Sequence, residues 1–118
     1  MKVLFIINEA PYGSEKAYNA LRLAMAMQKD DAITCDVRVF LLADAVTAAL
    51  PMQDTPHGYY NIERMLAAVI ARGGMVKLCG TCCEARGLKD VALVAGIDIS
   101  TMAQLAAWTA ESDRVLVF

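Results

Sequence analysis

The chain has 118 residues, of which 58% are hydrophobic, and a formal net charge of −2. This length leaves room for one domain, and an apolar share above the roughly 45–50% of ordinary globular chains excludes disorder. The 11 basic and 13 acidic residues form no long run of either sign, which argues against direct binding of nucleic acid through a broad basic surface. We therefore expect a single α/β domain over residues 1–118.

Membrane insertion and export are not predicted by the apolar segments. No run reaches the roughly 18 apolar residues that a membrane span needs. The opening Met1 to Asn8 has one basic residue, a short apolar core and no small-residue cleavage site, so it fits a buried strand better than a signal peptide. Four cysteines without an export signal predict a cytoplasmic protein with free thiols.

The apolar excess also bears on assembly. A chain this small has too much surface to hide all its apolar side chains in one core. Exposed apolar patches usually meet a partner, so we expect a permanent subunit interface.

The first half of the chain alternates strand and helix patterns. Val3 to Ile7 is a continuous apolar run that suits a strand covered on both faces. Ser14 has the residue type of a helix N-cap, for a helix that reaches about Lys29. A second β-type run extends from Val37 to Leu42, and a short helix is plausible from Ala45 to Leu50.

The second half begins with a proline- and glycine-containing loop, residues 51–60, which holds the only histidine, His57. Asn61 opens the clearest helix pattern, which Gly73 and Gly74 end. The remaining expected elements are a strand at 75–78, a strand or buried turn at 91–99, a helix capped by Thr101 and Gln104, and a strand at 115–118.

This alternation predicts a three-layer α/β sandwich, with a mostly parallel sheet and helices on both faces. Ligands in such sheets bind outside the carboxyl ends of the strands. Three segments meet that description: Asn8 to Ser14, the residues from Asp44 onward, and Cys79 to Arg86. Asn8 and Glu9 are therefore candidates to line a site there.

Cys79 is the main candidate for chemistry because it follows the third strand directly. The thiolate is the reactive form of cysteine, and a helix N-terminus lowers a thiol pKa. A short helix beginning near Thr81 would turn its free N–H groups toward the Cys79 sulfur. Gly80 would let the backbone turn closely, and Arg86 would add positive charge.

The other cysteines have different expected roles. Cys35 and Cys83 are expected to serve as small buried hydrophobes. Cys79 and Cys82 have the Cys-x-x-Cys spacing, which is compatible with zinc, with a thioredoxin-like dithiol, or with a persulfide carried on one activated thiol. Zinc needs four ligands in tetrahedral geometry, or three and a water. Cys83 is adjacent to Cys82 and cannot easily complete that geometry, and His57 lies in a separate loop. We therefore expect neither a metal nor a cofactor.

Three segments together resemble the DsrE/DsrF/TusD-type sulfur-relay family: Lys2-Val3-Leu4-Phe5-Ile6-Ile7-Asn8, the helix from Glu15, and Val76-Lys77-Leu78-Cys79-Gly80-Thr81-Cys82-Cys83-Glu84-Ala85-Arg86-Gly87. The resemblance covers the whole chain in element order. It implies a compact α/β fold, a trimer or hexamer, and a cysteine, at the position of Cys79, that accepts sulfane sulfur from a protein persulfide. Members of the tRNA-thiolating type tend to have small apolar residues where Cys82 and Cys83 stand, so the chain is more similar to the Cys-x-x-Cys branch.

The sequence-based hypothesis is an intracellular sulfur-transfer protein, a possible sulfurtransferase, whose partners are sulfur donor and acceptor proteins. Cys79 would accept the sulfur, and Cys82 would release it by forming a disulfide or would accept it in turn. The expected binding residues are Asn8, Glu9, Gly80, Thr81 and Arg86. Two alternatives stay open: an oligomeric protein with inert cysteines, and a Cys79/Cys82 dithiol redox protein.

Overall fold

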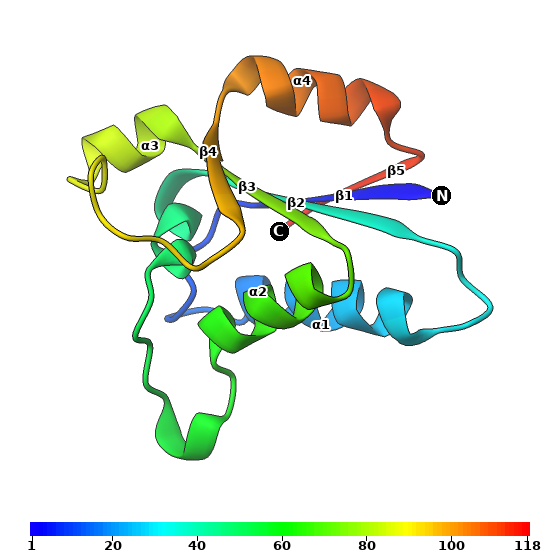
Figure 1. The fold of residues 1–118 in the computed structure, drawn as a ribbon, viewed down its shortest axis with the longest axis horizontal. Coiled ribbons are helices and arrows are strands. Elements are labelled where there is room, and N and C mark those ends of the chain that lie inside the picture. The colour runs from blue at the N-terminus through cyan, green and yellow to red at the C-terminus, as the bar shows by residue number, and fades with distance from the viewer.

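The computed structural model describes all of residues 1–118, which form one five-stranded sheet and the helices that cover it (Figure 1). The strands are β1 (Lys2–Ile7), β2 (Asp36–Leu41), β3 (Met75–Cys79), β4 (Ile97–Ser100) and β5 (Arg114–Val117). The α-helices are α1 (Lys16–Lys29), α2 (Ile62–Ala71), α3 (Gly80–Ala85) and α4 (Met102–Glu111), and two 3₁₀ helices are η1 (Ala43–Ala49) and η2 (Pro56–Gly58).

The sheet has the strand order β4-β3-β2-β1-β5, and every neighbouring pair is parallel. Helices α1 and α2 lie on one side of the sheet, and α3 and α4 lie on the other (Figure 1). The predicted three-layer α/β sandwich is confirmed, with a sheet that is parallel throughout. The order places the carboxyl ends of β1, β2 and β3 side by side.

The central strands are buried because both of their faces are covered. Val3, Leu4 and Phe5 of β1 are fully buried, and so are Val39 and Phe40 of β2. This double burial explains why these strands are continuous apolar runs without polar alternation. The edge strands β4 and β5 are only partly covered.

Helix boundaries follow local capping chemistry. The Asn61 side chain accepts a hydrogen bond from the Arg64 N–H at 3.0 Å, and Thr101 accepts one from the Gln104 N–H at 3.2 Å. Both caps agree with the sequence prediction. Ser14 is not the N-cap of α1: Glu15 occupies that position, and the Ser14 hydroxyl, one residue earlier, accepts only a long hydrogen bond of 3.4 Å from the Lys16 N–H.

Two further segments differ from expectation. The short helix after β2 is a 3₁₀ helix that begins two residues earlier, because the positive φ of 51° at Ala43 ends the extended backbone there and η1 starts at once. The 91–99 segment forms a strand only from Ile97. The Val94 N–H donates to the Ala49 carbonyl at 2.8 Å, which places that part of the loop beside η1 instead of extending β4.

Residues 51–61 form an arm that projects from the body of the molecule (Figure 1). Gln53 fixes its base, because its amide donates to the carbonyls of Ala48 and Leu50 at 2.8 Å each. Beyond that base the arm exposes Tyr59 and Tyr60, which are 69% and 48% exposed.

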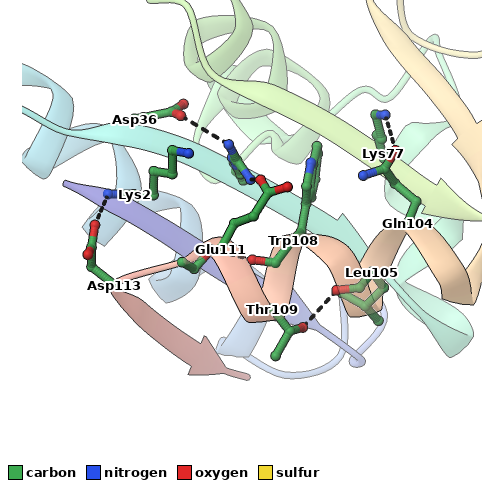
Figure 2. A network of polar contacts seen from close by, with 11 residues as sticks. Lys2, Asp36, Lys77, Gln104, Leu105, Trp108, Thr109, Glu111 and Asp113 are labelled. Atoms are coloured by element: carbon green, nitrogen blue, oxygen red, sulfur yellow. Dashed lines mark hydrogen bonds and ion pairs between the residues drawn. The ribbon is translucent and has the colours of Figure 1, made fainter.

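A polar layer lies between α4 and the sheet (Figure 2). Arg38 of β2 is buried, and its guanidinium donates to Glu111 at 2.7 Å. Lys77 of β3 donates to Gln104 at 3.2 Å. The Trp108 ring lies between these two cations, which are 5.4 Å and 5.1 Å from its centroid. These contacts define the face of the sheet toward which Lys77 points.

Candidate functional site

Cys79 is the last residue of β3 and the N-cap of α3. Side chains alternate along a strand, so Cys79 shares with Lys77 the face of the sheet that α3 and α4 cover. Its Sγ accepts a hydrogen bond from the Cys82 N–H at 3.3 Å and lies 3.2 Å from the Thr81 hydroxyl oxygen. The sulfur therefore occupies the position where a capping oxygen usually sits.

These contacts determine the acidity of the thiol. Burial alone would raise the pKa of Cys79. Hydrogen bonds from the Cys82 thiol, the Thr81 hydroxyl and the backbone N–H groups of both residues act in the opposite direction, and the pKa falls below that of an ordinary cysteine. The local structure thus favours a thiolate at Cys79.

The sulfur lies just beneath the molecular surface. Cys79 is 6% exposed, whereas Thr81, whose hydroxyl contacts it, is exposed. Gly80 keeps the first turn of α3 close to β4: a Cβ there would lie 3.2 Å from both the Ile99 Cγ2 and the Ser100 carbonyl oxygen. A residue without a side chain is what this approach needs.

Cys82 is the second thiol of the site and has the opposite tendency. Its Sγ accepts a hydrogen bond from the Ala43 N–H at 3.3 Å. Burial and the hydrogen bond with Cys79 raise the pKa of Cys82. The two thiols of the pair are therefore unequal, one favoured as thiolate and the other as neutral thiol.

Arg86 is directed toward η1 rather than toward Cys79. Its Nε donates to the Asp44 carboxylate at 2.9 Å, and its guanidinium also donates to the Cys82 carbonyl at 3.1 Å. Its positive charge acts to lower the pKa of Cys82 and of Cys83. Asp44 thereby ties η1 to the end of α3.

The remaining predicted residues lie apart from this pair. The Asn8 N–H and side-chain amide both approach the Phe118 carbonyl, at 2.8 Å and 3.5 Å. Glu9 forms an ion pair with Lys16 at 3.3 Å. The polar contacts of Asn8 and Glu9 therefore stabilise the end of β1, and neither includes a cysteine.

Cys35 and Cys83 pack as small apolar side chains. Cys83 is 1% exposed, and its burial raises its pKa. Cys35 is half-buried against the core before β2, and burial raises its pKa as well.

Two wider properties bear on the chemistry of the site. No group of three or more His, Cys, Asp or Glu side chains lies close enough together to hold a metal ion. None of the helices has the length and apolar character that crossing a membrane requires.

Sequence reasoning did not identify the Ala43 N–H as a donor to Cys82. An alanine carries no side-chain signal for a backbone contact, and its positive φ cannot be read from residue type. Only the neighbouring order of β2 and β3 brings these segments together.

Known proteins resemble the chain over its whole length. The model of the DsrE/DsrF-like family matches residues 1–118. Protein YchN of Escherichia coli K12 is 44% identical over 117 residues, which cover 99% of this chain and 98% of that protein. Uncharacterized protein MJ0989 of Methanocaldococcus jannaschii is 42% identical and is covered completely.

Solved structures agree with these sequence relationships. The crystal structure of the E. coli ychN protein has a TM-score of 0.93 and 44% identity, with 100% of this chain and 99% of that chain covered. Protein MTH1491 of Methanobacterium thermoautotrophicum, at 16% identity with a TM-score of 0.73, shares the fold over 99% of this chain and 98% of that one. The chain belongs to the DsrE/DsrF-like family.

Proposed function

We propose that the protein carries sulfane sulfur as a persulfide on Cys79 and passes it to a partner thiol. The observation that carries this proposal is the set of N–H and hydroxyl donors around the Cys79 sulfur, which stabilises a thiolate. Membership of the DsrE/DsrF-like family is consistent with the proposal, because the resemblance of the chain to sulfur-relay proteins implies such a role.

The transfer consists of two displacements on sulfur. The Cys79 thiolate attacks the outer sulfur of a donor persulfide, so that a sulfur–sulfur bond forms at Cys79 and the donor leaves as its thiolate. An acceptor thiolate then attacks the outer sulfur of the Cys79 persulfide and regenerates the Cys79 thiolate. No electron is gained or lost overall in either step.

Cys82 offers a second way to discharge the carrier. Its thiolate can attack the inner sulfur of the Cys79 persulfide, which gives a Cys79–Cys82 disulfide and releases hydrosulfide. A thiol reductant must then restore the pair. The proposal requires a compartment reducing enough to do so, in keeping with a cytoplasmic location.

Mass spectrometry after exposure to a low-molecular-weight persulfide tests the proposal. We expect a mass increase of one sulfur atom at Cys79 in the wild type and in Cys35→Ser, the matched control for a half-buried cysteine elsewhere. Cys79→Ser should lose this labelling. Labelling that persists in Cys79→Ser, or native thiols that are all unreactive, would show that Cys79 is not the carrier.

A dithiol redox role is the second candidate, and the unequal acidity of Cys79 and Cys82 favours it. One thiol is poised for attack and the other stays protonated until a mixed disulfide forms. This role predicts a reversible Cys79–Cys82 disulfide with a defined potential and no stable persulfide. Titration in glutathione buffers, followed by mass spectrometry, separates the two roles.

We also propose that the chain assembles as a trimer or hexamer through α4 and the neighbouring β5 edge. On this side of the molecule the outer face of α4 exposes Met102 and several alanines. Val115 and Val117 of β5, which pair with Leu4 and Ile6, are 38% and 66% exposed. Contiguous exposed apolar side chains of this kind mark subunit contacts. Light scattering should give a multiple of the 12.8 kDa chain mass, and Val117→Lys should reduce it.

A further inference from the structure

Two adjoining pockets lie away from the cysteines, between α1, the β1–α1 loop and the arm of residues 51–61. One has a volume of about 590 Å³ and the other about 490 Å³. They share Tyr18, Tyr59 and Tyr60, so that three aromatic rings line the region common to both. Each volume lies within the range of small-molecule sites, and no cysteine contributes to either.

The two pockets differ in charge. The 490 Å³ pocket is lined by Arg22, Lys29 and Arg64, and none of the three forms an ion pair with a carboxylate. The 590 Å³ pocket has one charged lining residue, Glu15. A bound anion would therefore place its charge in the 490 Å³ pocket.

Several contacts already hold the walls in place. The Tyr12 hydroxyl donates to Gln53 of the arm and accepts from the Ile62 N–H at 3.1 Å. The Arg64 guanidinium lies directly against Gly58, where φ is +74° and any Cβ would collide with it. The Arg22 guanidinium lies 5.3 Å from the centroid of the Tyr18 ring. These contacts place Arg22 beside the Tyr18 ring and Arg64 against the backbone of the arm.

We propose that this double pocket binds a nucleoside phosphate. Stacking on tyrosine rings is suited to a planar base, and guanidinium groups bind phosphate oxygens in a bidentate manner. The base would lie among Tyr18, Tyr59 and Tyr60, and the phosphates would lie against Arg22 and Arg64. The chain has no Gly-x-Gly phosphate loop, so side chains carry the phosphate recognition.

Isothermal titration calorimetry at low salt tests the proposal, with ADP, adenosine and pyrophosphate as the probes. ADP should bind with one site per chain and more tightly than adenosine or pyrophosphate. Arg64→Gln and Arg22→Gln should each weaken ADP binding about tenfold or more. Arg72→Gln, on the same helix as Arg64 but outside the pocket, should leave binding unchanged.

Cys79→Ser should bind ADP like the wild type, so the result is independent of sulfur chemistry. Trp108 fluorescence reports the folding of each variant. This residue lies on the face of the sheet opposite the pocket, so a ligand bound there does not contact it. Failure of ADP to bind at about 1 mM would overturn the proposal. So would binding that is equal in Arg64→Gln, Arg22→Gln and Arg72→Gln. A change of oligomeric mass in the pocket variants, without ADP binding, would instead assign the pocket to a second copy of the chain.

Discussion

Replacement of Thr81 by valine keeps the shape of the side chain and removes the hydroxyl that contacts the Cys79 sulfur at 3.2 Å. A hydrogen bond to a charged group contributes about 1.5–3 kcal/mol, and one pKa unit corresponds to about 1.4 kcal/mol. Sulfur accepts hydrogen bonds weakly and Thr81 is exposed, so we expect the free energy of this hydrogen bond to lie at the lower end of that range. We expect the pKa of Cys79 to rise by about one unit.

The assay is the rate of alkylation by iodoacetamide as a function of pH, with the modified residue identified by mass spectrometry. The rate follows the thiolate fraction, so Thr81→Val should shift the Cys79 midpoint upward and slow the reaction at neutral pH by about five- to tenfold. Thr81→Ser keeps the hydroxyl and should stay close to the wild type. Cys35, whose pKa is set by burial first, provides an internal control in every sample.

An unchanged Cys79 midpoint in Thr81→Val would refute the reasoning, provided that the variant is folded. It would mean that the Cys82 thiol and the backbone N–H groups determine the acidity of Cys79 without the Thr81 hydroxyl. An equal shift in Thr81→Val and Thr81→Ser would show that packing, rather than the hydroxyl, is responsible.

Three further perturbations test neighbouring contacts. Arg86→Gln removes a charge that lowers the pKa of Cys82, so alkylation of Cys82 should move to higher pH. Glu111 has a lowered pKa because Arg38 donates a hydrogen bond to it. The stability that this carboxylate contributes is fully present above the ordinary glutamate pKa of about 4.3. It is lost as the pH falls through the lower pKa of the folded state. Urea unfolding should therefore find the wild type more stable than Glu111→Gln at pH 7, with the difference vanishing in acid. Gly80→Ala should lower the free energy of unfolding by about 1–3 kcal/mol, because the added Cβ overpacks α3 against β4. The fluorescence of the single tryptophan follows the unfolding. An unchanged midpoint of urea unfolding would show that α3 can move to make room.

Most of the fold could be predicted because the pattern of apolar residues within each strand and helix is local, extending over only a few residues. The continuous apolar run at β1 and the i, i+3, i+4 pattern of α2 each specify burial locally. The short helix after β2 was predicted to start two residues too late, because a positive φ at an alanine leaves no trace in residue type. The start of β4 was misplaced because Val94 bonds to Ala49, a contact between distant segments.

The candidate site was predictable where it depends on adjacent residues. Cys79 ends β3 and Gly80 and Thr81 follow it directly, so their geometry comes from one turn of chain. The direction of Arg86 was not predictable, because it depends on Asp44, which lies 42 residues earlier. Asn8 at the end of β1 was placed at the correct edge of the sheet, but both of its hydrogen bonds are made to the carbonyl of Phe118, the residue after β5.

The polar layer beneath α4 determines how this helix can dock. Leu105 and Trp108 would tolerate some rotation or sliding of a helix in which half of the other residues are alanine. The α4 members of the pairs Arg38–Glu111 and Lys77–Gln104 are seven residues apart, about 10 Å along the helix axis. A shift or rotation of α4 that keeps one hydrogen bond would therefore strain the other. Arg38 is buried whereas Glu111 is half exposed, and the two directional contacts together favour the helix position in which both can form. The layer therefore favours one orientation of α4, which keeps its alanine-rich side facing outward and makes a repeating, symmetric contact geometrically possible.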